Sequence, residues 1–303
     1  MSLRPNRRPS TSSTPPPPLP GPVPAEPDLP GLRQRARSLL PGVGRLFPPG
    51  RVAVLRLYGS IAGGARAADW IELTKHLRDS PRVPAVVLDV DSGGGSAAAS
   101  DDLFLALERL AARKPLVVSI RGVGASGAYL AAMAGHRIVA NPNAAVGSIG
   151  VIAIGPRVPR LLERAGVGVS ETRAGRLKGM GAPWREETDE ERAKEQELVD
   201  GYYAAFVGRV AASRKLSEER VRELATGELW LGTRARELGL VDEIGDLEHA
   251  IEVAARLAGV PARGAPVRLR RPLLSRLMDR FATRAASALM AAVEARLDDR
   301  IRM

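Results

Sequence analysis

The chain has 303 residues, of which 45% are apolar and 26% charged, a composition typical of one large globular domain or two modest ones. It contains no cysteine, which excludes disulfides, thiolate zinc sites, iron–sulfur clusters and a cysteine nucleophile. The net charge of +11 lies in two tails, because residues 1–51 and 261–303 each carry +6 and the residues between them carry −1. A folded nucleic-acid-binding surface is therefore not expected.

Residues 1–50 are predicted to be a proline-rich, disordered basic segment. Eleven of the 24 prolines lie within residues 1–30, and such a composition cannot pack a core. The first arginines are followed by prolines instead of the apolar stretch of a secretory signal, and no apolar run reaches the length of a transmembrane helix. We therefore expect a cytoplasmic protein.

Residues 51–260 are predicted to form one α/β domain with a largely parallel sheet. Glycine-rich turns at 91–96 and 122–127 each follow a predicted strand and precede a predicted helix. The strands are continuously apolar, which is typical of parallel sheets covered on both faces. The expected strands are 52–57, 85–90, 116–120 and 137–140, and the expected helices are 67–78, 97–112 and 128–134.

A long helix and a basic tail complete the predicted elements. Thr188 and Glu191 form a capping-box signal, and the helix after them carries an apolar stripe from Leu198 to Val210 that indicates core or an oligomer interface. Residues 261–303 are predicted to contain a basic amphipathic helix that packs on a partner subunit or lies on a membrane. The basic tails are either attracted to the anionic inner face of a membrane or stay solvated, and the solvated alternative is favoured.

The second glycine-rich turn is compatible with two kinds of chemistry. Residues 122–127 (GVGASG) match the G-x-G-x-x-G fingerprint of dinucleotide-binding proteins, but residues 138–150 lack the acidic residue that would hold the ribose. Alternatively, Ser126 stands where a helix begins, and the free amides there suit an oxyanion, so Ser126 is a candidate nucleophile. The sequence around it departs from the G-x-S-x-G elbow of α/β-hydrolases.

The base that would activate Ser126 has two candidates. His136 is near it in sequence but lies at a predicted helix end, where a cap or surface role is favoured, and the three histidines form no zinc-binding pattern. Arginine keeps its proton at any working pH, so a lysine is the other kind of base to consider. Lys178 lies in a glycine-rich stretch near Arg173 and Arg176, whose positive charges favour a neutral amine; a solvated loop residue is the alternative.

Several blocks of the sequence occur in the order of a known family. They are residues 88–96 (LDVDSGGGS), 125–129 (ASGAY), 140–142 (ANP), 147–151 (GSIGV), 175–185 (GRLKGMGAPWR) and the closing segments 232–235, 238–242 and 244–245. Through these blocks, residues 52–250 resemble the signal peptide peptidase A (SppA) family of serine–lysine peptidases, within the Clp protease and crotonase superfamily. Gly93, Ala128 and Leu177 depart from that family's proline, glycine and tyrosine.

The resemblance implies a fold of repeated β-β-α units and a serine endopeptidase acting on small or unfolded peptides, such as apolar, signal-peptide-like segments. Ser126 would be the nucleophile and Lys178 the general base of a Ser–Lys dyad. The backbone amides of Gly127 and Gly95, with Gly94 as the next candidate, would form the oxyanion hole. The family implies no metal, nucleotide or other cofactor. It also implies a homo-oligomeric ring, in which Lys178 serves its own subunit or a neighbour.

Two other functions fit the same sequence. A crotonase-like acyl-CoA enzyme would share the fold and the two oxyanion amides, and Ser126 and Lys178 would then be incidental. A non-catalytic scaffold would assemble on membranes through its basic tails. Acyl-CoA binding would indicate the first function, and membrane binding without hydrolysis would indicate the second.

Overall fold

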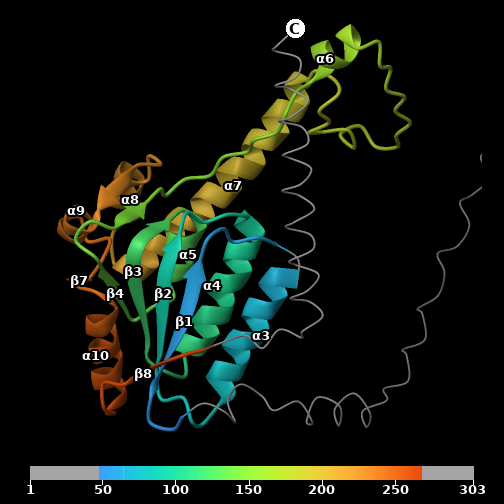
Figure 1. Ribbon diagram of the computed structural model, residues 1–303. Helices are drawn as coiled ribbons and strands as arrows, with labels where there is room; N and C mark the ends of the chain where they lie inside the picture. The colour runs from blue at the N-terminus through green and yellow to red at the C-terminus, as the bar shows by residue number, and fades with distance from the viewer. Residues whose placement is uncertain (1–47, 64, 268–303) are drawn as a thin grey trace, which may run out of the picture. The chain divides into compact units, whose positions relative to one another are not determined.

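The computed structural model describes residues 48–63 and 65–267 (Figure 1). Residues 1–47 of the predicted proline-rich segment and residues 268–303 of the predicted basic tail lie outside the described residues. Within the described part of the chain, no helix is both long and apolar enough to span a membrane. The predictions made for the two tails therefore stay predictions.

An eight-stranded sheet lies at the centre of the described residues. In spatial order its main strands are β6 (Leu229–Leu231), β5 (Ala145–Gly147), β3 (Leu116–Ala125), β2 (Val86–Ser92), β1 (Val52–Tyr58) and β8 (Gly264–Pro266). In addition, β4 (Arg137–Ala140) pairs with β3, and β7 (Glu243–Ile244) pairs with β4. Every pairing is parallel except that of β5 with β6. The predicted α/β class with a largely parallel sheet is confirmed.

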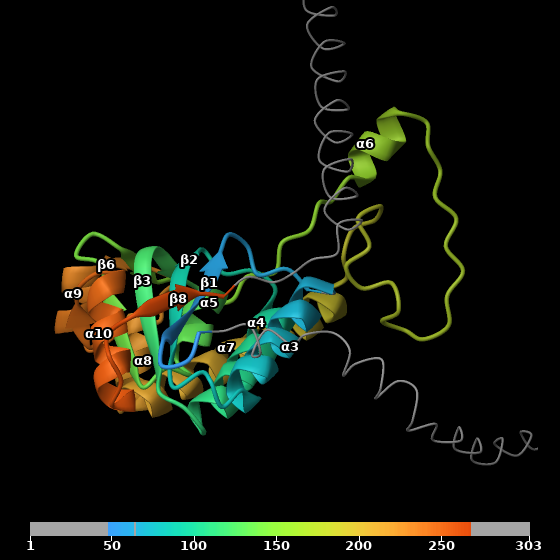
Figure 2. The same ribbon diagram turned by 60° about the horizontal axis from the view of Figure 1, so that its bottom comes forward.

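Helices cover both faces of this sheet (Figures 1 and 2). They are α3 (Ala65–Asp79), α4 (Ala97–Ala111), α5 (Gly127–Ala132), α6 (Pro159–Arg164), α7 (Asp189–Arg214), α8 (Glu218–Leu224), α9 (Gly232–Glu237) and α10 (Leu247–Ala258). On one face, α3, α4, α5 and the end of α7 share an apolar core with Leu55, Leu88 and Val118. On the other face, α10 packs against Val87 and Val117. Because both faces are buried, the central strands are apolar at successive positions.

Strand β3 is longer than the sequence indicated. We predicted a strand over residues 116–120 and a turn over 122–127, but β3 continues to Ala125. Its last residues pair in parallel with β5, and a register shift between β2 and β3 lets Ser92 pair with Gly124. The predicted turn is therefore reduced to the junction between β3 and α5.

The first half of α7 leaves the core. The helix begins with the predicted capping box, in which the side chains of Thr188 and Glu191 each accept a hydrogen bond from the other's backbone amide. In the predicted apolar stripe, Phe206 is buried, whereas Leu198 and Tyr202 are 46% and 50% exposed. Only the second half of the stripe is thus part of the core.

The chain between β5 and α7 contains a long exposed segment. None of the described residues 152–190 is buried, and Ile152 and Ile154 are 79% and 86% exposed. In Figures 1 and 2 this part of the chain, which includes α6, stands away from the sheet. We call residues 152–188 the projecting segment.

Candidate active site

Ser126 lies at the junction of β3 and α5, where it occupies the N-cap position of the helix. Its φ of 52° falls in the left-handed region, which a non-glycine residue adopts at an energetic cost. Two backbone bonds hold this conformation: the Ser126 amide donates to the carbonyl of Gly147 at 2.8 Å, and the Ser126 carbonyl accepts from the amide of Leu130 at 2.9 Å. The Ser126 hydroxyl makes no capping bond, so it stays available at this sharp strand-to-helix turn.

The loop after β2 lies against the start of α5. A Cβ added to Gly94, whose φ is 92°, would lie 2.6 Å from the amide nitrogen of Gly127 and 2.9 Å from the Cβ of Ser126. A Cβ added to Gly127 would lie 2.0 Å from the Oγ of Ser100 and 3.5 Å from the amide nitrogen of Gly95. The structure therefore brings together four of the five predicted site residues, and only glycine permits so close an approach.

Two backbone amides at this contact are free. The Ile61 amide donates to the Gly94 carbonyl at 2.8 Å, and the Ser96 amide donates to the Ile61 carbonyl at 2.9 Å. Because this ladder uses the groups on either side of Gly95, the Gly95 amide points away from Ile61. The Gly127 amide is the first of α5, where a helix offers no carbonyl partner. Neither amide has a hydrogen-bond partner among the described residues, so both can donate to an oxyanion.

A cavity of about 570 Å³ opens beside Ser126. Many of the surrounding side chains are apolar or aromatic, including Leu130 of α5 and Tyr202 and Phe206 of α7. Ser148 also lines the cavity, and its φ of 48° makes it a second strained serine at the site. Ser148 was not among the predicted site residues, although it lies in the GSIGV block. This volume is within the range of pockets that bind small ligands, about 300–1,000 Å³.

The charges in the cavity wall neutralise each other. Arg209 of α7 forms an ion pair with Asp101 of α4, and both residues line the cavity. The Arg209 guanidinium also lies 4.4 Å from the centre of the Phe104 ring, a cation–π contact. The cavity therefore suits apolar side chains better than charged ones.

Lys178 lies in the projecting segment, where it is exposed. It is not among the residues that line the cavity beside Ser126. Its amide donates to the carbonyl of Gly175 at 3.2 Å, whereas its side chain has no hydrogen bond or ion pair with any described residue. Within one chain, the structure does not bring Lys178 and Ser126 together.

The other candidate base, His136, lies at the far end of β3 from Ser126. Its Nδ1 accepts a hydrogen bond from the Leu116 amide at 3.1 Å, and its own amide donates to the Leu116 carbonyl at 2.8 Å. Leu116 begins β3 and Ser126 follows its end, so at roughly 3.3 Å per residue they are about 30 Å apart. His136 therefore supports the sheet and cannot activate Ser126 of the same chain. Within the described residues, no cluster of three or more histidine and acidic side chains could hold a metal ion.

Comparison with known proteins shows the family of this chain. The profile of peptidase family S49 matches residues 108–261, about half of the chain, and this range includes Ser126 and Lys178. The chain belongs to peptidase family S49. The predicted resemblance to the SppA family is confirmed, and membership of a peptidase family supports a serine protease.

Individual relatives agree with the family assignment. A Synechocystis protein that is named as a protease is 37% identical over 212 residues, which are 69% of this S49 chain and 75% of that protein. The chloroplastic serine protease SPPA of Arabidopsis thaliana is 32% identical over 222 residues, 70% of this chain and 33% of the plant protein. Among solved structures, a mutant of ClpP1 from Listeria monocytogenes is similar with a TM-score of 0.46 and 16% identity, over 65% of this chain and 93% of that one.

Proposed function

We propose that this S49 chain is a serine endopeptidase with a Ser126–Lys178 dyad. The observation that carries the proposal is the strained Ser126 beside the two free amides of Gly95 and Gly127. A nucleophile and two oxyanion donors at one point are what acyl transfer requires of a protein. Membership of family S49 supports the same chemistry.

In the proposed reaction, the Ser126 hydroxyl oxygen attacks the peptide carbonyl carbon while the neutral Lys178 amine accepts the hydroxyl proton. The carbonyl oxygen becomes an oxyanion, which the amides of Gly127 and Gly95 bind, while Gly94 keeps their loops close together. The C–N bond then breaks as Lys178 passes the proton to the leaving amine, and an acyl-enzyme remains. Water that Lys178 deprotonates hydrolyses this ester and restores Ser126.

A second copy of the chain completes the proposed site. In one chain Lys178 is outside the cavity, and the projecting segment that carries it exposes apolar side chains, including Ile154 at 86% and Leu161 at 64%. Several large apolar side chains exposed on one segment favour contact with another protein. Docking of this segment on a neighbour would bury these side chains and bring Lys178 to the neighbour's Ser126, in a homo-oligomeric ring.

The proposed substrates are unfolded or small peptides with small or apolar residues before the cleaved bond. The apolar cavity beside Ser126, with its paired Arg209 and Asp101, supports this preference. Apolar, signal-peptide-like segments fit this preference. Action in the cytoplasm, with the basic tails attracted to an anionic membrane surface, is part of the same proposal.

Cleavage of casein at pH 8 tests the dyad. The wild-type protein should cleave casein, and Ser126→Ala and Lys178→Ala should each lower the rate by about 10³-fold or more. Lys194→Ala is the matched control, because Lys194 lies on α7 and pairs only with Glu197 among the described residues. Full activity of Lys178→Ala would rule out the proposed base, and absence of cleavage by the folded wild type would rule out a general peptidase.

A further inference from the structure

Lys178 lies in a short run of turns that its own side chain does not stabilise. The amide of Lys178 donates to Gly175, that of Met180 to Leu177 and that of Ala182 to Gly179, all through backbone carbonyls. Local turns of this kind leave the direction of a segment open, because each bond spans only three residues. Contacts from outside the turns must therefore determine where the backbone of Lys178 lies.

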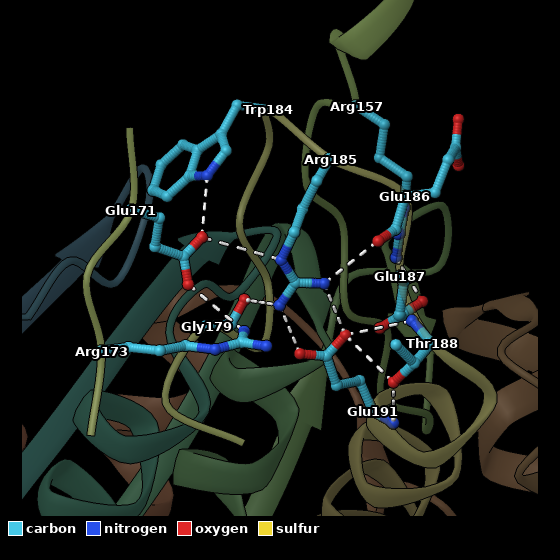
Figure 3. A network of polar contacts seen from close by, with 10 residues as sticks. All are labelled: Arg157, Glu171, Arg173, Gly179, Trp184, Arg185, Glu186, Glu187, Thr188 and Glu191. Carbon is cyan, nitrogen blue, oxygen red and sulfur yellow. Dashed lines mark hydrogen bonds and ion pairs between the residues drawn. The ribbon is translucent and has the colours of Figure 1, made fainter. Parts of the chain in front are cut away.

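Those contacts converge on Gly179, the residue directly after Lys178 (Figure 3). The carbonyl of Gly179 accepts a hydrogen bond from Arg185 Nη2 at 2.7 Å. A Cβ added to Gly179 would lie 2.5 Å from Arg173 Nη1, 2.6 Å from Glu171 Oε1 and 2.8 Å from Arg185 Nη2. Three charged side chains thus enclose the neighbour of Lys178, and Arg185 is the one that bonds to its backbone.

Arg185 is in turn fixed to the start of α7. Its Nη1 donates to Glu191 Oε2 at 2.8 Å, its Nη2 donates to Glu191 Oε1, and its Nη1 also donates to the carbonyl of Glu186 at 3.0 Å. Glu191 is 2% exposed and is the acidic member of the capping box with Thr188. The same helix continues into the core at Phe206, so Arg185 connects the backbone beside Lys178 to a helix that reaches the core.

We propose that Arg185 is the positioning residue of the base: it holds the backbone beside Lys178 to the first turn of α7. This inference deepens the proposed dyad and rests on it, since only a catalytic Lys178 needs positioning. Holding this backbone to Glu191 requires arginine, because a guanidinium can bond two carboxylate oxygens and a carbonyl simultaneously in one plane. A lysine at the same position keeps the charge, but its ammonium is one bond shorter than Nη2 and is a single nitrogen. It therefore cannot replace the four hydrogen bonds that Nη1 and Nη2 make to Glu191, Glu186 and Gly179.

The test compares Arg185→Lys with Arg157→Lys in the 303-residue chain. Arg157 is a matched control, because it also lies in the projecting segment and pairs with a carboxylate, that of Glu187, but does not contact Gly179. For Arg185→Lys we expect kcat on a fluorogenic peptide to fall about 10- to 100-fold, with KM within about twofold. The midpoint pH at which kcat/KM increases should be about one unit higher than in the wild type. A purely structural role of Arg185 would not produce this change. Arg157→Lys should match the wild type within about twofold.

Amide hydrogen exchange supplies a readout that does not depend on activity. Residues 176–182 should exchange about tenfold faster or more in Arg185→Lys, with the amides of β3 unchanged. Wild-type kcat and exchange in Arg185→Lys, beside an inactive Lys178→Ala, would overturn the positioning role and leave the dyad intact. A loss of oligomer or of thermal stability that accounts for the loss of activity would also overturn it. Full activity of Lys178→Ala would overturn the dyad and, with it, the role of Arg185.

Discussion

A Cβ added to Gly94 would lie 2.6 Å from the amide nitrogen of Gly127. These two glycines follow different strands, and the parallel pairing of β2 with β3 brings them together. The carboxyl ends of neighbouring parallel strands are where α/β sheets bind their ligands. The contact between Gly94 and Gly127 therefore marks the place where the candidate oxyanion hole is assembled.

This contact predicts that alanine is tolerated at Gly93 but not at Gly94. Gly94 has a φ of 92° and no room for a Cβ, whereas a Cβ added to Gly93 meets no atom within 4 Å. We expect Gly94→Ala to lower kcat by about 10²-fold or more, because it displaces the Gly127 amide, and Gly93→Ala to retain wild-type activity. Steady-state kinetics with circular dichroism as a fold control would measure both. Equal activity of the two variants would contradict an oxyanion hole at this contact.

Mixing two inactive variants tests whether the dyad forms between copies. Ser126→Ala keeps Lys178, and Lys178→Ala keeps Ser126. If neighbouring copies share each site, subunit exchange at equal concentrations should restore roughly a quarter of wild-type activity, the fraction of interfaces that pair an intact serine with an intact lysine. If each chain supplies both groups of its own site, the mixture should remain inactive.

His136→Ala should separate stability from catalysis. The Leu116 amide, at a fully buried residue, would lose the acceptor that His136 Nδ1 provides. An unpaired buried amide costs about 1–2 kcal/mol, so the urea midpoint should fall. Because His136 is far from Ser126, kcat should stay within about twofold of the wild type. A large drop in kcat with an unchanged midpoint would return His136 to the list of candidate bases.

The Arg185–Glu191 pair predicts a specific response to acid. The Arg185 guanidinium, together with the Thr188 amide, lowers the pKa of Glu191 from the ordinary 4.5 to about 2. Because the folded state favours the ionised carboxylate, this contribution to stability is fully present above about pH 4.5 and is lost as the pH falls from 4.5 towards 2.

Glu191→Gln should therefore melt at a lower temperature than the wild type at pH 7, and the difference should shrink below pH 4.5. Glu197→Gln is the matched control on α7, since Glu197 is 67% exposed and its pair with Lys194 contributes little. Thermal unfolding from pH 7 to pH 3 measures both differences. A difference between Glu191→Gln and wild type that does not change with pH would contradict the ionised pair.

The sequence by itself determined the local structure of this S49 chain. Continuous apolar runs predicted the central strands, because strands buried on both faces need apolar side chains at most positions. Thr188 and Glu191 predicted the start of α7, because a capping box is made entirely of groups three residues apart. The placement of Ser126 at the start of α5 was predicted for the same reason, since helix termini depend on nearby residues.

Only the tertiary structure decided which of these groups meet. The sequence could not show that β3 continues to Ala125, because its last residues are held by pairing with β5, a strand from another part of the chain. The sequence also could not show that Lys178 lies in a segment outside the cavity of Ser126. His136 is nearer to Ser126 in sequence than Lys178 is, yet it lies about 30 Å from Ser126 in the structure. Spacing along a chain determines hydrogen bonds within one turn, whereas distances between elements follow from sheet pairing and packing, which involve residues far apart in sequence.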